Sequence, residues 1–219
     1  MNIFSLRKSS DMVTPDHALP GRAERPFPVP ATHAVLGTPL ECPDGFPQDL
    51  EKIYVAMGCF WGAERRMWRL PGVYTTAVGY QGGYTPNPTY NEVCTGRTGH
   101  AEAVLVVYDP KQLPLYDLLK VFWENHDPTQ GYRQGNDVGT QYRSAVYFTD
   151  PAQEELARTT LQQYQAVLTG NGLDPITTEI APAEGLEFYY AEPEHQQYLA
   201  KTPHGYDCHA NTGYALPAL

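Results

Sequence analysis

Apolar residues follow two different periods along the chain after residue 50. The clearest apolar run, EAVLVVY at 102–108, is rich in β-branched residues and is bounded by Gly99 and by Asp109-Pro110, as expected of a buried strand. The same criteria predict further strands at 53–57, 73–80, 144–148, 176–180 and 187–191.

Helical spacing of apolar residues predicts one helix over 60–68 and another over 115–125. Asp150 followed by Pro151 is typical of a helix N-cap with proline in the first turn, so we expect a long amphipathic helix that ends near residue 168. Further short helices are expected at 92–95 and 194–198, and a loop at 131–139.

Residues 1–49 show neither period, because eight prolines interrupt them. We expect an irregular Pro-rich N-terminal extension there, lying as extended chain over the surface or partly disordered. We expect residues 50–219 to form a single domain whose tail, from about residue 200 to 219, is flexible and irregular.

Strands that alternate irregularly with two or three helices predict an α+β fold. We expect a two-layer α/β sandwich with a ferredoxin-like core, in which a mixed sheet carries its helices mainly on one face. A doubly wound nucleotide-binding fold is disfavoured, because GYQGG at 79–83 lacks the G-x-G-x-x-G spacing and no helix follows it.

The charge balance argues against nucleic-acid binding, since the formal net charge is −10 and no basic run is present. No stretch approaches 18 consecutive apolar residues, so no membrane span is expected. Residues 1–11 lack an uninterrupted apolar region of the secretory-signal type. We therefore expect a cytoplasmic protein.

Four cysteines are too few and too scattered for a disulfide scaffold: Cys42, Cys59, Cys94 and Cys208. In a reducing compartment such cysteines are structural, catalytic or redox-cycling. For Cys42 and Cys94 a passive role is favoured.

Cys59 follows a predicted strand and Gly58, and stands at the start of a predicted helix. Free backbone N–H groups and the positive end of the helix dipole there favour a thiolate, the reactive form of cysteine. Phe60 and Trp61 place two aromatic side chains beside it. The alternative is a small apolar residue that ends a strand, which is the commoner role of an arbitrary buried cysteine.

Several polar residues stand where burial would make them chemically informative. Glu102 opens the most apolar strand; if it points inward, desolvation raises its pKa and keeps it protonated. The alternative is a glutamate at the solvent end of the strand. Tyr90 and Tyr142 end two loops from which a phenol could reach a site at the strand ends. Asp137 lies in a polar loop, where an Asx-turn is the alternative role.

Cys208 lies in the irregular tail, and an exposed cysteine on a flexible segment suits thiol–disulfide exchange. One alternative is an incidental free thiol. Another is a metal site built from Cys208, His209, His204 and His195, but the spacing fits no standard zinc pattern.

A cysteine protease or acyl-transferase would need a histidine base, and His100, His126 and His195 are its candidates. None of the three forms a recognisable local signature. A helix-start cysteine with a second cysteine on a flexible tail fits a redox cycle better.

A set of dispersed motifs carries a specific resemblance. In chain order they are residues 58–64 (GCFWGAE), 79–84 (GYQGGY), 86–90 (PNPTY), 98–104 (TGHAEAV), 122–128 (FWENHDP), 135–144 (GNDVGTQYRS) and 194–199 (EHQQYL). Together they resemble the peptide methionine sulfoxide reductases of the A type, over about residues 50–208.

The resemblance implies a chemical role for each of four residues. The Cys59 thiolate attacks the sulfur of methionine sulfoxide, and protonated Glu102 gives its proton to the oxygen. Tyr90 and Tyr142 donate hydrogen bonds to that oxygen. Methionine leaves, and Cys59 becomes a sulfenic acid.

The resemblance also implies how the substrate is held and the enzyme regenerated. Phe60 and Trp61 hold the S-methyl group, while Asp137 and His195 orient the substrate or solvent. Cys208 resolves the sulfenic acid as a disulfide, which thioredoxin or dithiothreitol reduces. The family implies the S epimer, free or in oxidised proteins, no metal and no other cofactor. We expect a monomer.

One departure concerns the tail. Many members carry a further cysteine near the C-terminus, whereas residues 210–217 contain none, and Asp207 is inserted before Cys208. We therefore expect a single resolving step. A thiol peroxidase and a non-enzymatic peptide-binding module remain the alternative functions.

Overall fold

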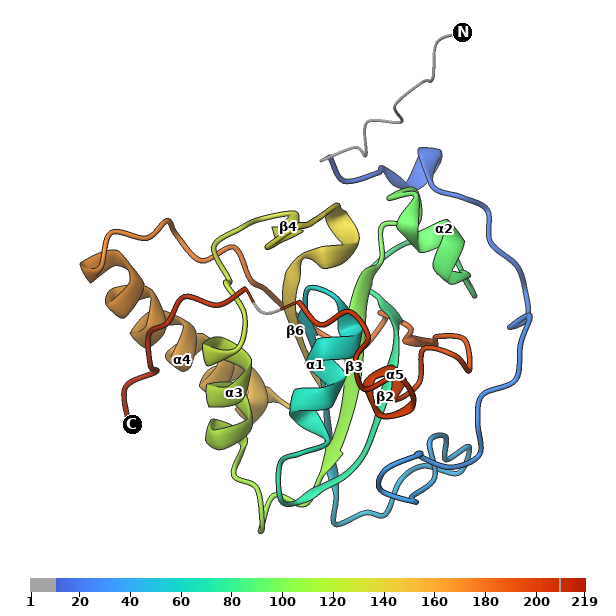
Figure 1. Ribbon diagram of the computed structural model, residues 1–219, viewed down its shortest axis with the longest axis horizontal. Coiled ribbons are helices and arrows are strands. Elements are labelled where there is room, and N and C mark those ends of the chain that lie inside the picture. Colours follow the sequence, from blue (N-terminus) through green and yellow to red (C-terminus); the bar gives the residue numbers. More distant parts are fainter. Residues whose placement is uncertain (1–10, 209) are drawn as a thin grey trace, which may run out of the picture.

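The computed structural model describes residues 11–208 and 210–219. In this part of the chain a mixed sheet has the strand order β7-β6-β1-β3-β2-β8 (Figure 1). Its strands are β1 (Glu51–Met57), β2 (Val73–Gln81), β3 (Ala101–Tyr108), β6 (Ser144–Phe148), β7 (Glu179–Pro182) and β8 (Tyr189–Tyr190). Neighbouring strands are antiparallel except β6 and β7, which are parallel.

Three helices pack on one face of this sheet and form the main core with it. They are α1 (Phe60–Met67), α3 (Leu115–Glu124) and α4 (Pro151–Gly170). The shorter elements are η1 (Pro15–His17), α2 (Tyr90–Cys94), η2 (Thr140–Tyr142), α5 (Tyr198–Lys201) and the hairpin of β4 (Arg133–Gln134) with β5 (Asp137–Val138).

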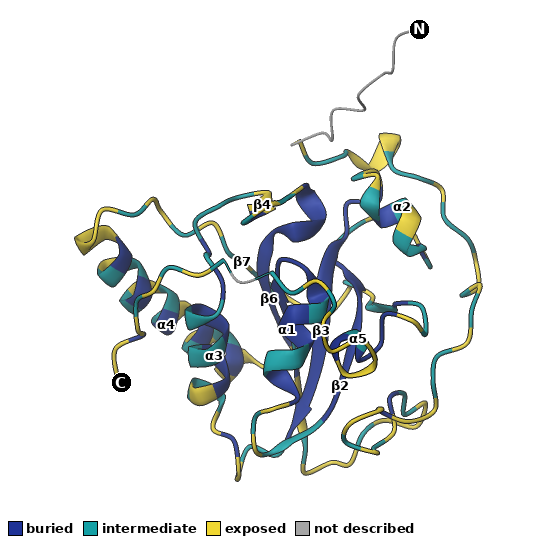
Figure 2. Cartoon of the chain, in the orientation of Figure 1, coloured by how far each residue is buried: buried dark blue, intermediate teal, exposed yellow. Residues whose placement is uncertain are grey.

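β3 is buried along its whole length, because both faces of the sheet are covered (Figure 2). Val104 and Val106 belong to the core under the helices, whereas Leu105 and Val107 pack with Leu40 of the N-terminal segment. Side chains alternate along a strand, so Glu102 shares the helix-facing side with Val104. This alternation directs its carboxyl group towards α1.

The turn from β1 into α1 requires glycine at position 58. Gly58 has φ +86°, and a Cβ there would lie 2.5 Å from Gln134 Cγ. The following residue, Cys59, is the N-cap of α1. Gly58 therefore lets the chain turn sharply before Cys59, and its lack of a side chain lets Gln134 of the β4–β5 hairpin pack against it.

The predicted α+β fold with a mixed sheet is confirmed, and most elements lie where the periodicity predicts them. The strand predicted at 176–180 is wrong in its bounds, since β7 begins at Glu179. Residues before it bond elsewhere: the Ile176 N–H donates to Gln165 Oε1 and the Thr177 N–H to Pro128 O. The last predicted strand shortens to β8, which pairs with Gly79 and Tyr80 alone.

Two further predictions need correction. The helix predicted at 194–198 begins only at Tyr198, because Gln197 is held in a left-handed conformation with φ +47°. The loop predicted at 131–139 contains the β4–β5 hairpin. Across the described residues, no helix combines the length and apolar character needed to cross a membrane.

Candidate active site

Cys59 stands at the N-terminus of α1 with 7% of its surface exposed. Burial raises the pKa of its thiol well above the usual value, and the carboxylates of Glu102 and Asp137 add to this. Hydrogen bonds from the Trp61 and Gly62 N–H groups act in the opposite direction but are outweighed. The N–H groups at the helix start therefore act on Cys59 in the expected direction, but burial of the sulfur has the larger effect on its pKa.

Glu102 is 1% exposed and enters the site from β3. The Phe60 N–H, at the first helical position of α1, donates to its Oε2 at 2.9 Å. Tyr80 lies directly opposite Glu102 in the β2–β3 register. The carboxyl group thus lies inside the core at the start of α1, away from water, which favours the neutral form of a carboxyl group.

Two tyrosines predicted from the loops gather around Glu102. Tyr90 is the first residue of α2, and Tyr142 ends η2, which packs against β3. Burial first, and then the charge of Glu102, raises the pKa of each phenol above its ordinary value of 10. Both hydroxyls therefore keep their protons at physiological pH and can donate hydrogen bonds.

Aromatic rings form one wall beside the sulfur. Phe60 and Trp61 lie 6.4 Å apart by ring centroids, and Tyr90 stacks with both. His195 lies 4.3 Å from the Tyr90 ring, and Tyr198 stacks on Trp61 at 4.1 Å. Apolar ring faces in this arrangement can hold a methyl group beside a nucleophilic sulfur.

His195 is oriented within this wall. Trp61 Nε1–H donates to His195 Nδ1 at 3.2 Å, and burial lowers the pKa of the imidazole. A neutral ring whose Nδ1 accepts a hydrogen bond carries its proton on Nε2. His195 can therefore present one N–H donor away from Trp61.

Asp137 and Cys208 meet at the β4–β5 hairpin. Asp137 lies in β5 and accepts a hydrogen bond at 3.1 Å from the hydroxyl of Tyr206. Cys208 Sγ lies 3.6 Å from the Gln134 carbonyl oxygen, and its thiol donates to it. Gln134 also packs on Gly58, so this one residue touches both the turn that carries Cys59 and the second sulfur. All four cysteines are free.

The structure adds site residues that the sequence did not indicate. Glu192 accepts from the Tyr80 hydroxyl at 2.8 Å and from the Tyr90 N–H at 2.7 Å, and so fixes the start of α2. Tyr206 joins Asp137 to the tail. Cys94 lies one helical turn from Tyr90 and interacts with its hydroxyl, which a passive role does not predict. Most of these contacts join residues that are far apart in the chain, and the contact of Cys94 with Tyr90 lies within a helix of five residues. Neither kind of contact leaves a recognisable pattern in the local sequence.

The alternative chemistries find little support in the geometry. His126 uses both ring nitrogens, on Phe122 O and Ser144 Oγ, and His100 bonds the Gly83 N–H and Thr85 O. Neither is therefore available to a cysteine as a base. His209 lies outside the described residues; within the ranges 11–208 and 210–219, no three His, Cys, Asp or Glu side chains are grouped to hold a metal ion.

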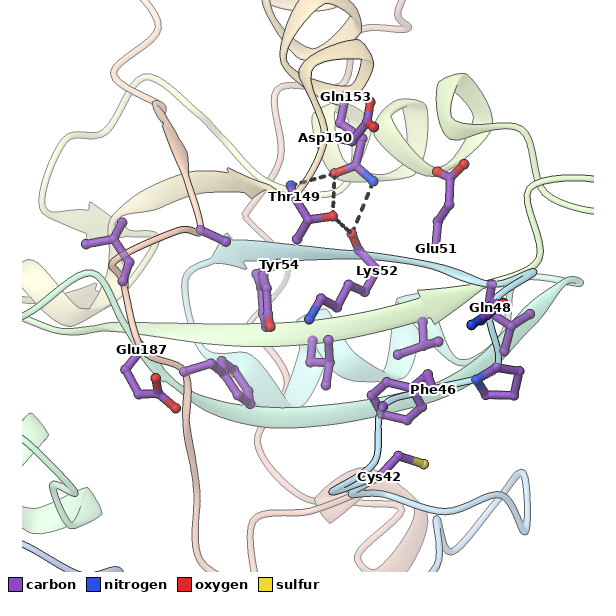
Figure 3. Close-up of a pocket in the computed structure, with 18 of the residues that line it drawn as sticks. Cys42, Phe46, Gln48, Glu51, Lys52, Tyr54, Thr149, Asp150, Gln153 and Glu187 are labelled. Carbon is purple, nitrogen blue, oxygen red and sulfur yellow. Dashed lines mark hydrogen bonds between the residues drawn. The ribbon is translucent and has the colours of Figure 1, made fainter.

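A cavity of about 860 Å³ lies on the opposite face of the sheet (Figure 3). Cys42, Phe46, Lys52 and Glu187 contribute to its lining, and hydrogen bonds from Thr149 and Gln153 to the Lys52 carbonyl close one side. None of the predicted site residues lines it. This hollow is therefore separate from the cluster around Cys59.

Comparison with known proteins places the chain in a defined group. The family model described as peptide methionine sulfoxide reductase matches residues 51–217. Peptide methionine sulfoxide reductase MsrA of Pseudomonas aeruginosa is 59% identical over 213 residues, covering 97% of each chain. MsrA 1 of Synechocystis sp. is 57% identical, covering 99% of this chain and 96% of that protein.

Solved structures agree with these sequence relatives. Methionine sulfoxide reductase A of Corynebacterium diphtheriae superposes with a TM-score of 0.84 at 50% identity, over 95% of this chain and all of that one. Mxr1 of Saccharomyces cerevisiae in its reduced form gives a TM-score of 0.69 at 34% identity, over 78% of this chain and 95% of that one.

Proposed function

Since the chain belongs to the peptide methionine sulfoxide reductase family, we propose that it reduces the S epimer of methionine sulfoxide, free or in proteins, by a cysteine redox cycle. Cys59 is the nucleophile, and Glu102 is the acid. The observation that carries this assignment is the hydrogen bond from Phe60 N–H to Glu102 Oε2, which joins the acid to the helix that begins at the nucleophile.

In the first step the Cys59 sulfur attacks the sulfoxide sulfur, and the oxygen ends on Cys59 as a sulfenic acid. Glu102 gives its proton to the sulfoxide oxygen. The carboxylate that remains takes the proton that the Cys59 thiol loses, so the protons balance. Removal from water favours the neutral form of a carboxyl group, so burial prepares Glu102 to be the donor.

Tyr90 and Tyr142 stabilise the charge that develops on the sulfoxide oxygen. Their raised phenol pKa values keep both as hydrogen-bond donors, and donors aimed at a developing oxyanion act strongly in a site closed to water. Phe60 and Trp61 receive the S-methyl group. Asp137 and His195 orient the substrate and the solvent around it.

In the second step Cys208 attacks the sulfenic acid of Cys59, and a disulfide and water are formed. Thioredoxin, or dithiothreitol in solution, reduces that disulfide and restores both thiols. The chemistry requires no metal and no organic cofactor. We further propose that the protein is a monomer and that it is located in the cytoplasm, where such a cysteine cycle can be reduced.

A substrate assay separates this proposal from the two alternative functions. We expect the protein with dithiothreitol to convert the S-sulfoxide of a methionine peptide, and not the R-sulfoxide. Cys59→Ser should abolish the reaction, whereas Cys42→Ser, at a cysteine in the cavity on the far face, should leave it intact. Faster consumption of hydrogen peroxide than of sulfoxide would favour a thiol peroxidase, and binding without turnover would favour a peptide-binding module.

A further inference from the structure

Asp207, the residue inserted before Cys208, bonds to the helix that begins at Cys59. Its side chain is 6% exposed and forms ion pairs with Arg65 and Arg66 of α1, the second between Arg66 Nη1 and Asp207 Oδ1 at 3.1 Å. Two guanidinium groups therefore hold one nearly buried carboxylate. We refer to these three residues as the Asp207 clamp.

The clamp is itself held in place. Arg66 Nη1 also donates to the Gly62 carbonyl at 2.8 Å, and Arg66 Nε donates to Asn125 Oδ1 at 3.3 Å. Gly62 leaves room for the Asp207 carboxylate, which a side chain at that position would displace. Gly62 stands one helical turn after Cys59, so the tail is fixed close to the nucleophile.

Neighbouring tail residues face the other way. The Tyr206 hydroxyl donates to Asp137, and the Cys208 thiol donates to the Gln134 carbonyl, so both contact the β4–β5 hairpin. Further along, the Leu216 N–H donates to Glu124 Oε1 of α3. Figure 1 shows this red C-terminal segment crossing from α5 past α1 towards α3 and α4. The clamp thus fixes the chain immediately before Cys208.

We propose that Asp207 is a positioning residue for disulfide formation, because its ion pairs with Arg65 and Arg66 hold the Cys208 sulfur close to Cys59. This inference rests on the proposed two-step function. In the step concerned, the Cys208 sulfur bonds to the Cys59 sulfur while the S–O bond of the sulfenic acid breaks. The hydroxide that leaves takes the thiol proton of Cys208 and departs as water, so no further oxidant or reductant is needed.

The physical reason is effective concentration. Without the clamp, the segment between α5 and the anchored residues near Leu216 samples many positions, and few of them bring the two sulfurs together. Its ion-pair partners, Arg65 and Arg66, are not among the residues that we assign to sulfoxide binding, so the first step should not depend on the clamp. A loss confined to the second step is therefore the signature of a positioning role.

Asp207→Asn tests this, since it keeps the shape of the side chain and removes its charge. Enzyme without reductant is mixed with the S-sulfoxide of a methionine peptide and quenched over time. The amount of methionine formed follows the first step. The second step is followed by the ratio of the Cys59–Cys208 disulfide to the Cys59 sulfenic acid that dimedone traps. We expect the first step to change less than twofold and the second to slow by about tenfold or more.

Asp174→Asn, the same change at an exposed loop residue, is the matched control and should form disulfide at the wild-type rate. Arg65→Gln removes one arm of the clamp, and circular dichroism verifies folding of each variant. Disulfide formation at the wild-type rate in Asp207→Asn, or in Arg65→Gln if the former does not fold, would overturn the proposal. Absence of methionine from the wild-type protein would instead overturn the proposed function.

Discussion

The Phe60 N–H donates to Glu102 Oε2 at 2.9 Å, and this one hydrogen bond ties the start of α1 to the middle strand β3. Because Phe60 directly follows Cys59, the bond also sets where the carboxyl group stands relative to the sulfur. The same carboxylate raises the pKa of Cys59, Tyr90 and Tyr142 in addition to the effect of their burial. Glu102 is therefore the residue to which the other polar groups of the site are coupled.

Glu102→Gln should slow the first step without preventing substrate binding. An amide keeps the size of the side chain but supplies no acidic proton, and loss of a general acid costs about 10²–10⁴-fold in rate. Single-turnover formation of methionine measures the effect. Glu155→Gln, an exposed change on α4, should remain at the wild-type rate. A Glu102→Gln rate within threefold of wild type would contradict the assignment.

Glu102→Gln should also make the resting Cys59 thiol easier to ionise. Burial is the largest cause of its raised pKa and remains in the variant. The second cause, the negative charge that Glu102 carries once its own proton has left, is absent in the variant. The rate at which iodoacetamide modifies Cys59 should therefore reach its half-maximum at lower pH than in the wild type. Peptide mapping follows Cys59 and Cys208 separately. An unchanged or higher midpoint for Cys59 would show that the two groups are not coupled.

Tyr90→Phe and Tyr142→Phe should each lower kcat more than they raise KM. Each removes a hydrogen-bond donor to the developing charge and leaves the ring in place, and one such donor is worth about 10²–10³-fold in kcat at its strongest. Because both phenol pKa values are raised, no loss of activity from phenol ionisation is expected up to about pH 9. Tyr116→Phe, on α3, serves as the control. A wild-type kcat in all three variants would show that the Tyr90 and Tyr142 hydroxyls take no part in the mechanism.

Glu64 should make the fold less stable as the pH rises. Burial raises its pKa from 4.5 to about 7, although hydrogen bonds from Gln197 and Thr76 oppose the shift. Between these two values the native state holds a proton that the unfolded state has released. The free energy of unfolding then falls by up to about 1.4 kcal/mol per pH unit in this window.

Urea denaturation of Glu64→Gln between pH 4.5 and 7 isolates this contribution. The buried histidines His33, His100 and His126 have pKa values lowered to about 4 and act in the opposite direction, so the difference between variant and wild type is the relevant quantity. That difference should change steadily with pH across this range. A constant difference would contradict the raised pKa of Glu64.

The same Glu64 network explains one limit of prediction from the sequence. Glu64 Oε2 accepts from the Gln197 N–H at 2.9 Å, and Glu64 Oε1 accepts from the Gln197 side chain at 2.7 Å. These bonds hold Gln197 in its left-handed conformation, so the predicted helix at 194–198 cannot include it. A contact between residues so far apart in the chain leaves no local signal.

Elements with a strong period were predictable, because burial on one or both faces dictates their residues. β3 and the Pro151 start of α4 are examples. Cys59 and Glu102 were identifiable for a related reason, since a cysteine at a helix start and an acid in an apolar strand violate the usual pattern. Glu192, Tyr206 and the Asp207 clamp follow no such rule, because their partners meet only in the folded chain.

The most direct measurement is one turnover of the reduced protein with an excess of methionine S-sulfoxide and no added reductant, followed by mass mapping of the cysteines. The two-step mechanism predicts one equivalent of methionine per chain and a disulfide between Cys59 and Cys208. Cys94 interacts with the Tyr90 hydroxyl, so it is the other cysteine whose oxidation the mass mapping must follow. A Cys59–Cys94 disulfide, or methionine formed with no cysteine oxidised, would contradict the mechanism.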